Sequence, residues 1–144
     1  MKITEITTES LRKEFIEFPK RLYKGDPNWV CPLDSETEAV FDTERNAAFR
    51  NGEAIRWILS GDDGTTIGRV AAFIDEIRSK ANRQPTGGLG FFEVIESREA
   101  AFILFDTARH WLTERGMKAM DGPINFGEND NYWGLLVDGF MQPG

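Results

Sequence analysis

Four polar side chains gather in the sequence shortly after an apolar segment in the C-terminal part of the chain. Asn125, Asn129, Asp130 and Asn131 follow Met117–Met120, which can form a short strand. Ligands of α/β proteins bind outside the carboxyl ends of strands, so amides and a carboxylate placed there could hold a small molecule. The alternative is turn and cap chemistry, because Asn and Asp favour turns and helix N-caps. Both interpretations stay open, and Asn125, Asn129 and Asp130 are candidate substrate-binding residues.

A strand, a helix and a second strand are predicted immediately before this cluster. Phe91–Ile95 is a short apolar run of aromatic and β-branched residues, typical of a buried strand. Ser97 is placed to be the N-cap of a helix, and Gly116 stands where a left-handed residue ends one. The apolar face of this helix comprises Ala101, Leu104, Phe105, Ala108, Trp111 and Leu112. Met117–Met120 would then be a strand parallel to Phe91–Ile95 and adjacent to it, reached by a right-handed crossover.

The N-terminal half adds helices and an antiparallel hairpin. The sequence Gly61-Asp62-Asp63-Gly64 is a strong turn signal between two strand-like runs. Pro19 lies inside the first predicted helix, so we expect a kink or an early end near Phe18. The predicted elements are a short strand within Lys2–Thr7, a helix from Thr8 or Ser10 to before Gly25, a helix over Ser35–Phe41, hairpin strands Glu53–Ser60 and Thr66–Asp75, and a last helix within Glu128–Gly139.

Composition narrows the classes of function. The 144-residue chain has a formal charge of −7 and a pI near 4.8, which argues against nucleic acid as a partner. No apolar run reaches the roughly 18 residues of a membrane span. The single cysteine, Cys31, cannot form an internal disulfide, so a cytoplasmic location fits. We interpret Cys31 as a small buried apolar residue, and its neighbour Trp29, expected to pack on the core, as a further candidate for substrate binding.

The order of these elements resembles the GCN5-related N-acetyltransferase (GNAT) superfamily. The resemblance is stronger to a set of longer bacterial proteins of uncharacterised function that are related to it. Three stretches carry it: YKGDPNWVCPL, the pairing of IGRVAAFID with GFFEV, and GPINFGENDNYWGLLVDGF with Arg115-Gly116 upstream. The resemblance implies an α/β fold (α+β in some schemes), with a mixed central sheet in the order first to fifth strand and helices on both faces.

The resemblance also implies an acyl-CoA site at the start of the helix after the fourth strand. In GNAT proteins a Gln/Arg-x-x-Gly-x-Gly/Ala turn binds the CoA pyrophosphate through backbone N–H groups. The pyrophosphate is an anion, and the N-terminus of a helix attracts anions through its free N–H groups and its dipole. The matching positions begin at Glu96. The implied residues for acetyl-CoA or another acyl-CoA are Ser97, Arg98, Glu99, Ala100 and Ala101. Glu96 and Glu99 depart from the pattern, and their negative charge predicts that acetyl-CoA binds weakly or not at all.

Two residues correspond to the acid and base that the resemblance implies. Glu93 matches a carboxylate on the central strands that relays a proton from the amine. The tyrosine that protonates the leaving thiolate would fall at Leu135, so Tyr132 is an inexact substitute. The alternative for Glu93 is a side chain that faces solvent or pairs with Arg56 or Arg69 on neighbouring strands.

Two classes of function follow, and neither needs a metal. The first is an acyl-CoA-dependent N-acyltransferase with Glu93 as base and a small amine as acceptor. The second is a non-catalytic GNAT-like half that binds a small molecule or packs against a second acyltransferase domain. The altered pyrophosphate turn and the missing tyrosine favour the second.

The pattern after the fifth strand leads to an expectation about assembly. GNAT domains continue beyond the final Gly-Phe, here Gly139-Phe140, into two further strands, so we expect this single domain to be the N-terminal part of a longer protein. Without those strands the fifth strand would be an uncovered edge. The sequence therefore predicts self-association or a second GNAT-like domain as partner.

Overall fold

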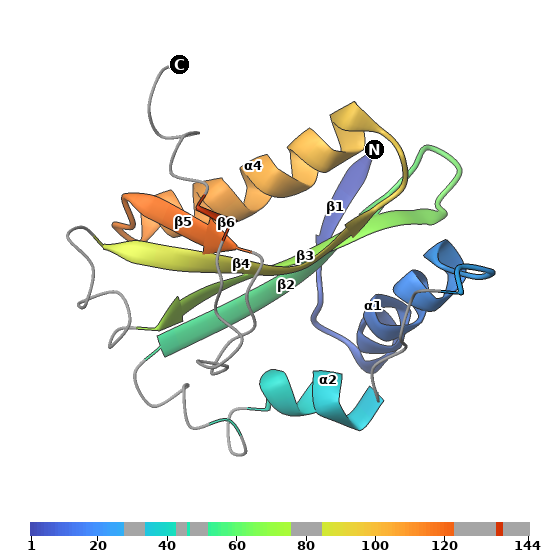
Figure 1. Ribbon diagram of the computed structural model, residues 1–144, viewed down its shortest axis with the longest axis horizontal. Coiled ribbons are helices and arrows are strands. Elements are labelled where there is room, and N and C mark those ends of the chain that lie inside the picture. Colours follow the sequence, from blue (N-terminus) through green and yellow to red (C-terminus); the bar gives the residue numbers. More distant parts are fainter. Residues whose placement is uncertain (28–33, 43–45, 47–51, 76–84, 123–134, 137–144) are drawn as a thin grey trace.

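A six-stranded sheet forms the centre of the molecule (Figure 1), in the computed structural model, which describes residues 1–27, 34–42, 46, 52–75, 85–122 and 135–136. The strands are β1 (Lys2–Glu5), β2 (Gly52–Ser60), β3 (Thr66–Asp75), β4 (Thr86–Val94), β5 (Ala119–Gly122) and β6 (Leu135–Leu136). The helices are α1 (Glu9–Leu22), α2 (Asp34–Val40) and α4 (Arg98–Glu114).

The strand order in the sheet is β1-β2-β3-β4-β5-β6. Neighbouring strands are antiparallel except β4 and β5, which pair in parallel through Thr86–Gly88 and Ala119–Asp121. The predicted hairpin, the crossover and the mixed sheet are therefore confirmed. The parallel pairing uses the beginning of β4, upstream of Phe91–Ile95, and β5 begins two residues later than predicted.

The helices cover both faces of the sheet, as predicted. Figure 1 shows α4 on one face and α1 with α2 on the other. On the α4 side, buried Leu104, Ala108 and Leu112 pack on Leu59 and Val70 of the sheet. Such a crossover helix must bury its apolar face on the sheet that it connects. Across the described parts of the chain, no helix is long and apolar enough to cross a membrane.

Two expectations about local structure differ from the structure. Of the two outcomes expected at Pro19, a kink or an early end near Phe18, the early end is wrong, because α1 continues through Pro19 to Leu22. The last helix predicted within Glu128–Gly139 is a strand at Leu135–Leu136, and the remainder of that segment lies outside the described residues. Short apolar runs fit helix and strand equally well, which explains the second error.

The fifth strand is not an uncovered edge where the structure describes it. β6 pairs antiparallel with β5, with Leu136 opposite Asp121 and Leu135 opposite Gly122. At least one strand therefore follows β5, and the predicted self-association loses this edge as its basis.

Gly122 keeps β5 close to β4 at the point where their pairing ends. A Cβ atom on Gly122 would lie 2.7 Å from the backbone oxygen of Leu89, closer than such atoms approach. Because a backbone atom cannot move aside cheaply, Gly122→Ala is expected to reduce the free energy of unfolding by roughly 1–3 kcal/mol. Chemical denaturation measures the change. Gly61→Ala is the matched control, since a Cβ atom on Gly61 would lie 3.4 Å from its nearest neighbour, a side-chain atom. An equal loss of stability in both variants would contradict this explanation.

Candidate functional site

The β4 strand changes its geometry just before the candidate base Glu93. In the pairing with β3, Arg69 lies opposite Glu93 and Ala71 opposite Gly90, so Phe91 and Phe92 together face Val70. Phe91 has a φ of 50°, the left-handed region that side chains other than glycine rarely adopt. This is a β-bulge, a feature that redirects side chains and is frequent beside active sites. Here it brings Phe91 and Glu93 to the face covered by α1 and α2.

The same part of β4 is also where the two parallel strands separate. The parallel pairing ends at Gly88 and Asp121, and β5 ends one residue later, while β4 continues to Val94. Figure 1 shows β4 running on past β5 toward the start of α4. In α/β sheets, ligands bind beyond the carboxyl ends of the strands. Glu93 therefore lies on the stretch of β4 that is suited to line a ligand site.

Glu93 has a specific partner on α1. The hydroxyl of Tyr23 donates a hydrogen bond to Oε2 of Glu93. Tyr23 is the C-cap of α1, and its own N–H bonds to the carbonyl of Pro19 at 2.9 Å. Burial, together with the hydrogen bond to Glu93, raises the pKa of Tyr23 to about 12, so its hydroxyl is a donor throughout the physiological pH range.

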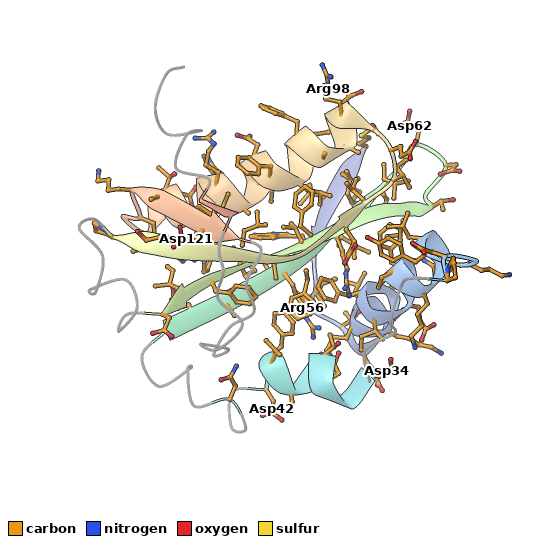
Figure 2. All side chains as sticks on the ribbon, in the orientation of Figure 1. Asp34, Asp42, Arg56, Asp62, Arg98 and Asp121 are labelled. Atoms are coloured by element: carbon orange, nitrogen blue, oxygen red, sulfur yellow. The ribbon has the colours of Figure 1, made fainter. Side chains whose placement is uncertain are left out.

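Two buried arginines lie on the same face of the sheet. The guanidinium of Arg69 lies 4.6 Å from the ring centroid of Phe15, and its Nη1 donates to the Phe15 carbonyl at 2.7 Å. Burial lowers the pKa of Arg69 to about 10, which the negative charge of Glu93 partly offsets. Burial also lowers the pKa of Arg56, whose Nη1 lies 3.4 Å from Glu38. Figure 2 shows Arg56 between the sheet and α2.

An aromatic cluster holds the two guanidiniums in place. The ring of Phe41 lies 4.2 Å from Arg56, and the ring of Phe91 lies 5.3 Å from Arg69. Phe15 packs against both of these rings, at 5.9 Å in each case. Ring faces are attractive to cations, so the cluster replaces part of the hydration that the arginines lose. The alternative prediction for Glu93 was a side chain facing solvent or an ion pair with Arg56 or Arg69. Arg69 lies opposite Glu93 in the strand pairing, but the described ion pairs include neither of the two expected pairs.

The residues predicted to bind acyl-CoA form the beginning of α4. Ser97 is the N-cap, and its hydroxyl accepts the N–H of Ala100 at 3.1 Å. The N–H of Ala101 bonds to the Ser97 carbonyl at 3.0 Å. The N–H groups of Arg98 and Glu99 are the first-turn donors left for an anion among the described contacts. Figure 2 shows Arg98 extending away from this end of the helix.

The other predicted site residues lie outside the described part of the chain. These are Trp29, Asn125, Asn129, Asp130 and Tyr132. The structure therefore places Glu93 near the end of β4 and the predicted acyl-CoA residues at the start of α4, and none of the described contacts joins the two groups. The rest of the predicted site is untested. Among the described residues, no group of three or more His, Cys, Asp or Glu side chains is arranged to hold a metal ion.

Tyr23 is the site residue that sequence reasoning missed. It lies at the end of α1 in the sequence RLYKG, distant along the chain from Glu93. A half-buried carboxylate on a central strand favours a nearby donor, but the sequence contains no signal that this donor comes from the end of α1.

A hollow lies beside α1 and does not include Glu93. Its volume is about 530 Å³, and it lies between α1 and strands β1 to β3. Glu14 at its wall accepts hydrogen bonds from Thr66 and from Arg21, and Arg21 pairs with its negative charge.

Three solved structures share the fold of this chain. A GNAT-family acetyltransferase from Staphylococcus aureus Mu50 aligns with a TM-score of 0.57 and 16% identity, over 85% of this chain and 72% of that one. A putative acetyltransferase from Pyrococcus furiosus aligns at 0.52 and 14%, over 89% and 86%. An aminoglycoside acetyltransferase from an uncultured soil sample, in complex with sisomicin, aligns at 0.53 and 13%, over 83% and 74%. The chain thus has the GNAT acetyltransferase fold, as the sequence resemblance implied.

Two curated bacterial proteins are similar in sequence. A protein named bacterial ceramide synthase, from Caulobacter vibrioides, is 34% identical over 99% of this chain and 37% of its own length. Protein YghO of Escherichia coli K12 is 31% identical over 91% of this chain and 33% of its own length. The chain therefore spans about a third of the length of these two relatives. No family model matches it.

Proposed function

We propose that this chain carries the acyl-transfer site of an N-acyltransferase, with Glu93 as general base. The observation that supports this most directly is the position of Glu93, which follows the β4 bulge, accepts a hydrogen bond from Tyr23 and lies where β4 extends beyond β5. A base must be fixed within reach of the proton that it removes, and these contacts fix it. The GNAT fold is consistent with acyl transfer to an amine, although fold alone does not define a reaction.

In this proposal Glu93 takes a proton from the amine as the amine nitrogen attacks the carbonyl carbon of a thioester. The C–S bond then breaks, an amide forms, and the proton goes to the departing thiolate to give a free thiol. The bulge at Phe91 and Phe92 leaves one residue of β4 outside the ladder, so a main-chain N–H there is suited to stabilise the oxyanion of the intermediate.

The name of one relative suggests the class of acceptor. A ceramide is an amide of a fatty acid and a long-chain amino alcohol, so a ceramide synthase acylates an amine. Among amine acceptors, a long-chain amino alcohol is therefore the first to test, with acetyl-CoA and a long-chain acyl-CoA as alternative donors. The chain spans about a third of the length of that relative. The choice of acceptor is therefore a hypothesis about the whole protein.

The second candidate is the non-catalytic GNAT-like half. The arrangement at the start of α4 favours it, because the side chain of Ser97 already occupies the Ala100 N–H and the exposed Glu99 adds negative charge where CoA phosphates would bind. Thiol release measured with a colorimetric reagent, over the two donors and a panel of amines, separates the two candidates. Amine-dependent release supports the acyltransferase, and its absence with every pair supports the non-catalytic half.

Acyl-CoA affinity is expected to respond to the charge of Glu99. We expect the wild-type Kd for acetyl-CoA to lie toward the weak end of the roughly 1 μM–1 mM range typical of enzyme KM values. Glu99→Gln keeps the size of the side chain but removes its repulsion of phosphates, so calorimetry should show several-fold tighter binding. Glu114→Gln at the other end of α4 is the control. Equal affinity in all three proteins, or a micromolar complex of the wild type, would contradict the role given to Glu99.

A further inference from the structure

Two groups interact with Glu93, one by hydrogen bonding and one by charge, and contacts with α1 fix both of them. Tyr23 donates directly to the Glu93 carboxylate. Arg69 is opposite Glu93 in the pairing of β3 with β4, yet its Nη1 donates to the carbonyl of Phe15 in α1. Among the described ion pairs there is none between Arg69 and Glu93, and the Nε of Arg69 is buried without a hydrogen-bond partner there.

Pro19 explains why the Phe15 carbonyl is available to Arg69. In a continuous helix, the N–H of residue 19 would bond to the carbonyl of residue 15. Proline has no N–H, so this carbonyl loses its helical partner inside α1. Arg69 supplies the missing donor. Proline is the least favourable residue in a helix interior, so its presence here points to a role outside the helix.

We propose that Pro19 and Tyr23 are positioning residues for Glu93. The hydroxyl of Tyr23 fixes the orientation of the carboxylate. The carbonyl that Pro19 frees holds Arg69 back, so that the guanidinium does not close an ion pair that would occupy the carboxylate oxygens. This inference rests on the proposed role of Glu93 as base, and it adds a reason for the proline and for the unusual burial of Arg69.

The first test is Tyr23→Phe, which removes the hydroxyl and keeps the ring. We expect kcat for amide formation to fall roughly 10- to 100-fold, as expected for a displaced catalytic group, with little change in the KM for the acyl donor. Thr66→Val is the matched control, because the Thr66 hydroxyl also bonds a carboxylate of α1, Glu14, but in the separate hollow. A similar loss of kcat in the control, or none in Tyr23→Phe, would overturn the role of Tyr23.

The second test is Pro19→Ala, which restores the helical donor to the Phe15 carbonyl. We expect the melting temperature to stay the same or rise, because alanine favours the helix and proline does not. Turnover is expected to fall, because the competing N–H releases Arg69 toward Glu93. A purely structural proline would change stability and turnover in the same direction, so parallel changes would contradict the proposal.

A measurement independent of activity separates this inference from the proposed function. The chain has two tyrosines, so Tyr23→Phe identifies the absorbance change due to Tyr23 in an alkaline titration. The hydrogen bond and the charge of Glu93 both raise the pKa of Tyr23, so Glu93→Gln should lower its titration midpoint. An unchanged midpoint would refute the contact between Tyr23 and Glu93. If the wild type transfers no acyl group to any amine while the midpoint does shift, the proposed function fails and the contact stands.

Discussion

Glu93→Gln is expected to lower kcat for amide formation by roughly 10²–10⁴-fold, the usual contribution of a positioned general base. Glutamine keeps the length of the side chain and an oxygen that can accept from Tyr23, so the site retains its shape. What it lacks is the ability to take a proton from the amine. Steady-state kinetics with saturating acyl donor measures the loss, and binding of the donor should be unchanged.

Glu14→Gln provides the matched control for this variant. Glu14 also connects α1 to the sheet through a hydroxyl, that of Thr66, but it lies outside the candidate site. Its kcat should stay near that of the wild type. Kinetics unchanged in Glu93→Gln would remove Glu93 from the mechanism and leave the non-catalytic half as the better explanation of the fold.

Phe15→Ala is expected to reduce the free energy of unfolding by roughly 3–5 kcal/mol, as for other buried phenylalanines. The ring of Phe15 is fully buried and contacts Phe41 and Phe91. It also lies 5.1 Å from the guanidinium of Arg56 and 4.6 Å from that of Arg69. Its removal leaves a cavity and takes an aromatic face from two buried cations, so the loss should lie at the upper end of this range.

Urea denaturation of Phe15→Ala measures this loss. Phe102→Ala is the control, since the same substitution is made on a side chain that is 66% exposed. The control should change stability by no more than about 0.5 kcal/mol. Similar losses in the two variants would show that the layer between α1 and the sheet does not depend on Phe15.

The sequence predicted most of the framework because its signals are local. The turn at Gly61–Gly64 has residues that favour a hairpin, and α4 has both a recognisable N-cap at Ser97 and an apolar face. The parallel pairing of β4 with β5 followed from the crossover rule. Each of these features is decided by residues close together in the chain.

The features that were not predicted depend on contacts between distant segments. The bulge at Phe91 requires a positive φ that no local pattern in GFFEV indicates. Tyr23 meets Glu93 only because α1 packs across β3 and β4. Pro19 was expected to kink its helix or end it early, and the structure shows that the helix continues and that Arg69 bonds the carbonyl that the proline leaves free. Tertiary contacts override local preference in all three cases.

The arrangement of the sheet has a consequence for how the chain folds. Among the described strands, those that are consecutive in the sequence are also neighbours in the sheet, so the sheet can grow from β1 to β6 in the order of synthesis. We expect β2, β3 and β4 to pair early, because short connections keep the contact order of this meander low. Since Glu93 lies on β4 and Tyr23 on α1, their contact can form before β5 and β6 join the sheet. Pulse-labelled hydrogen exchange should then show protection of β3 earlier than of β5.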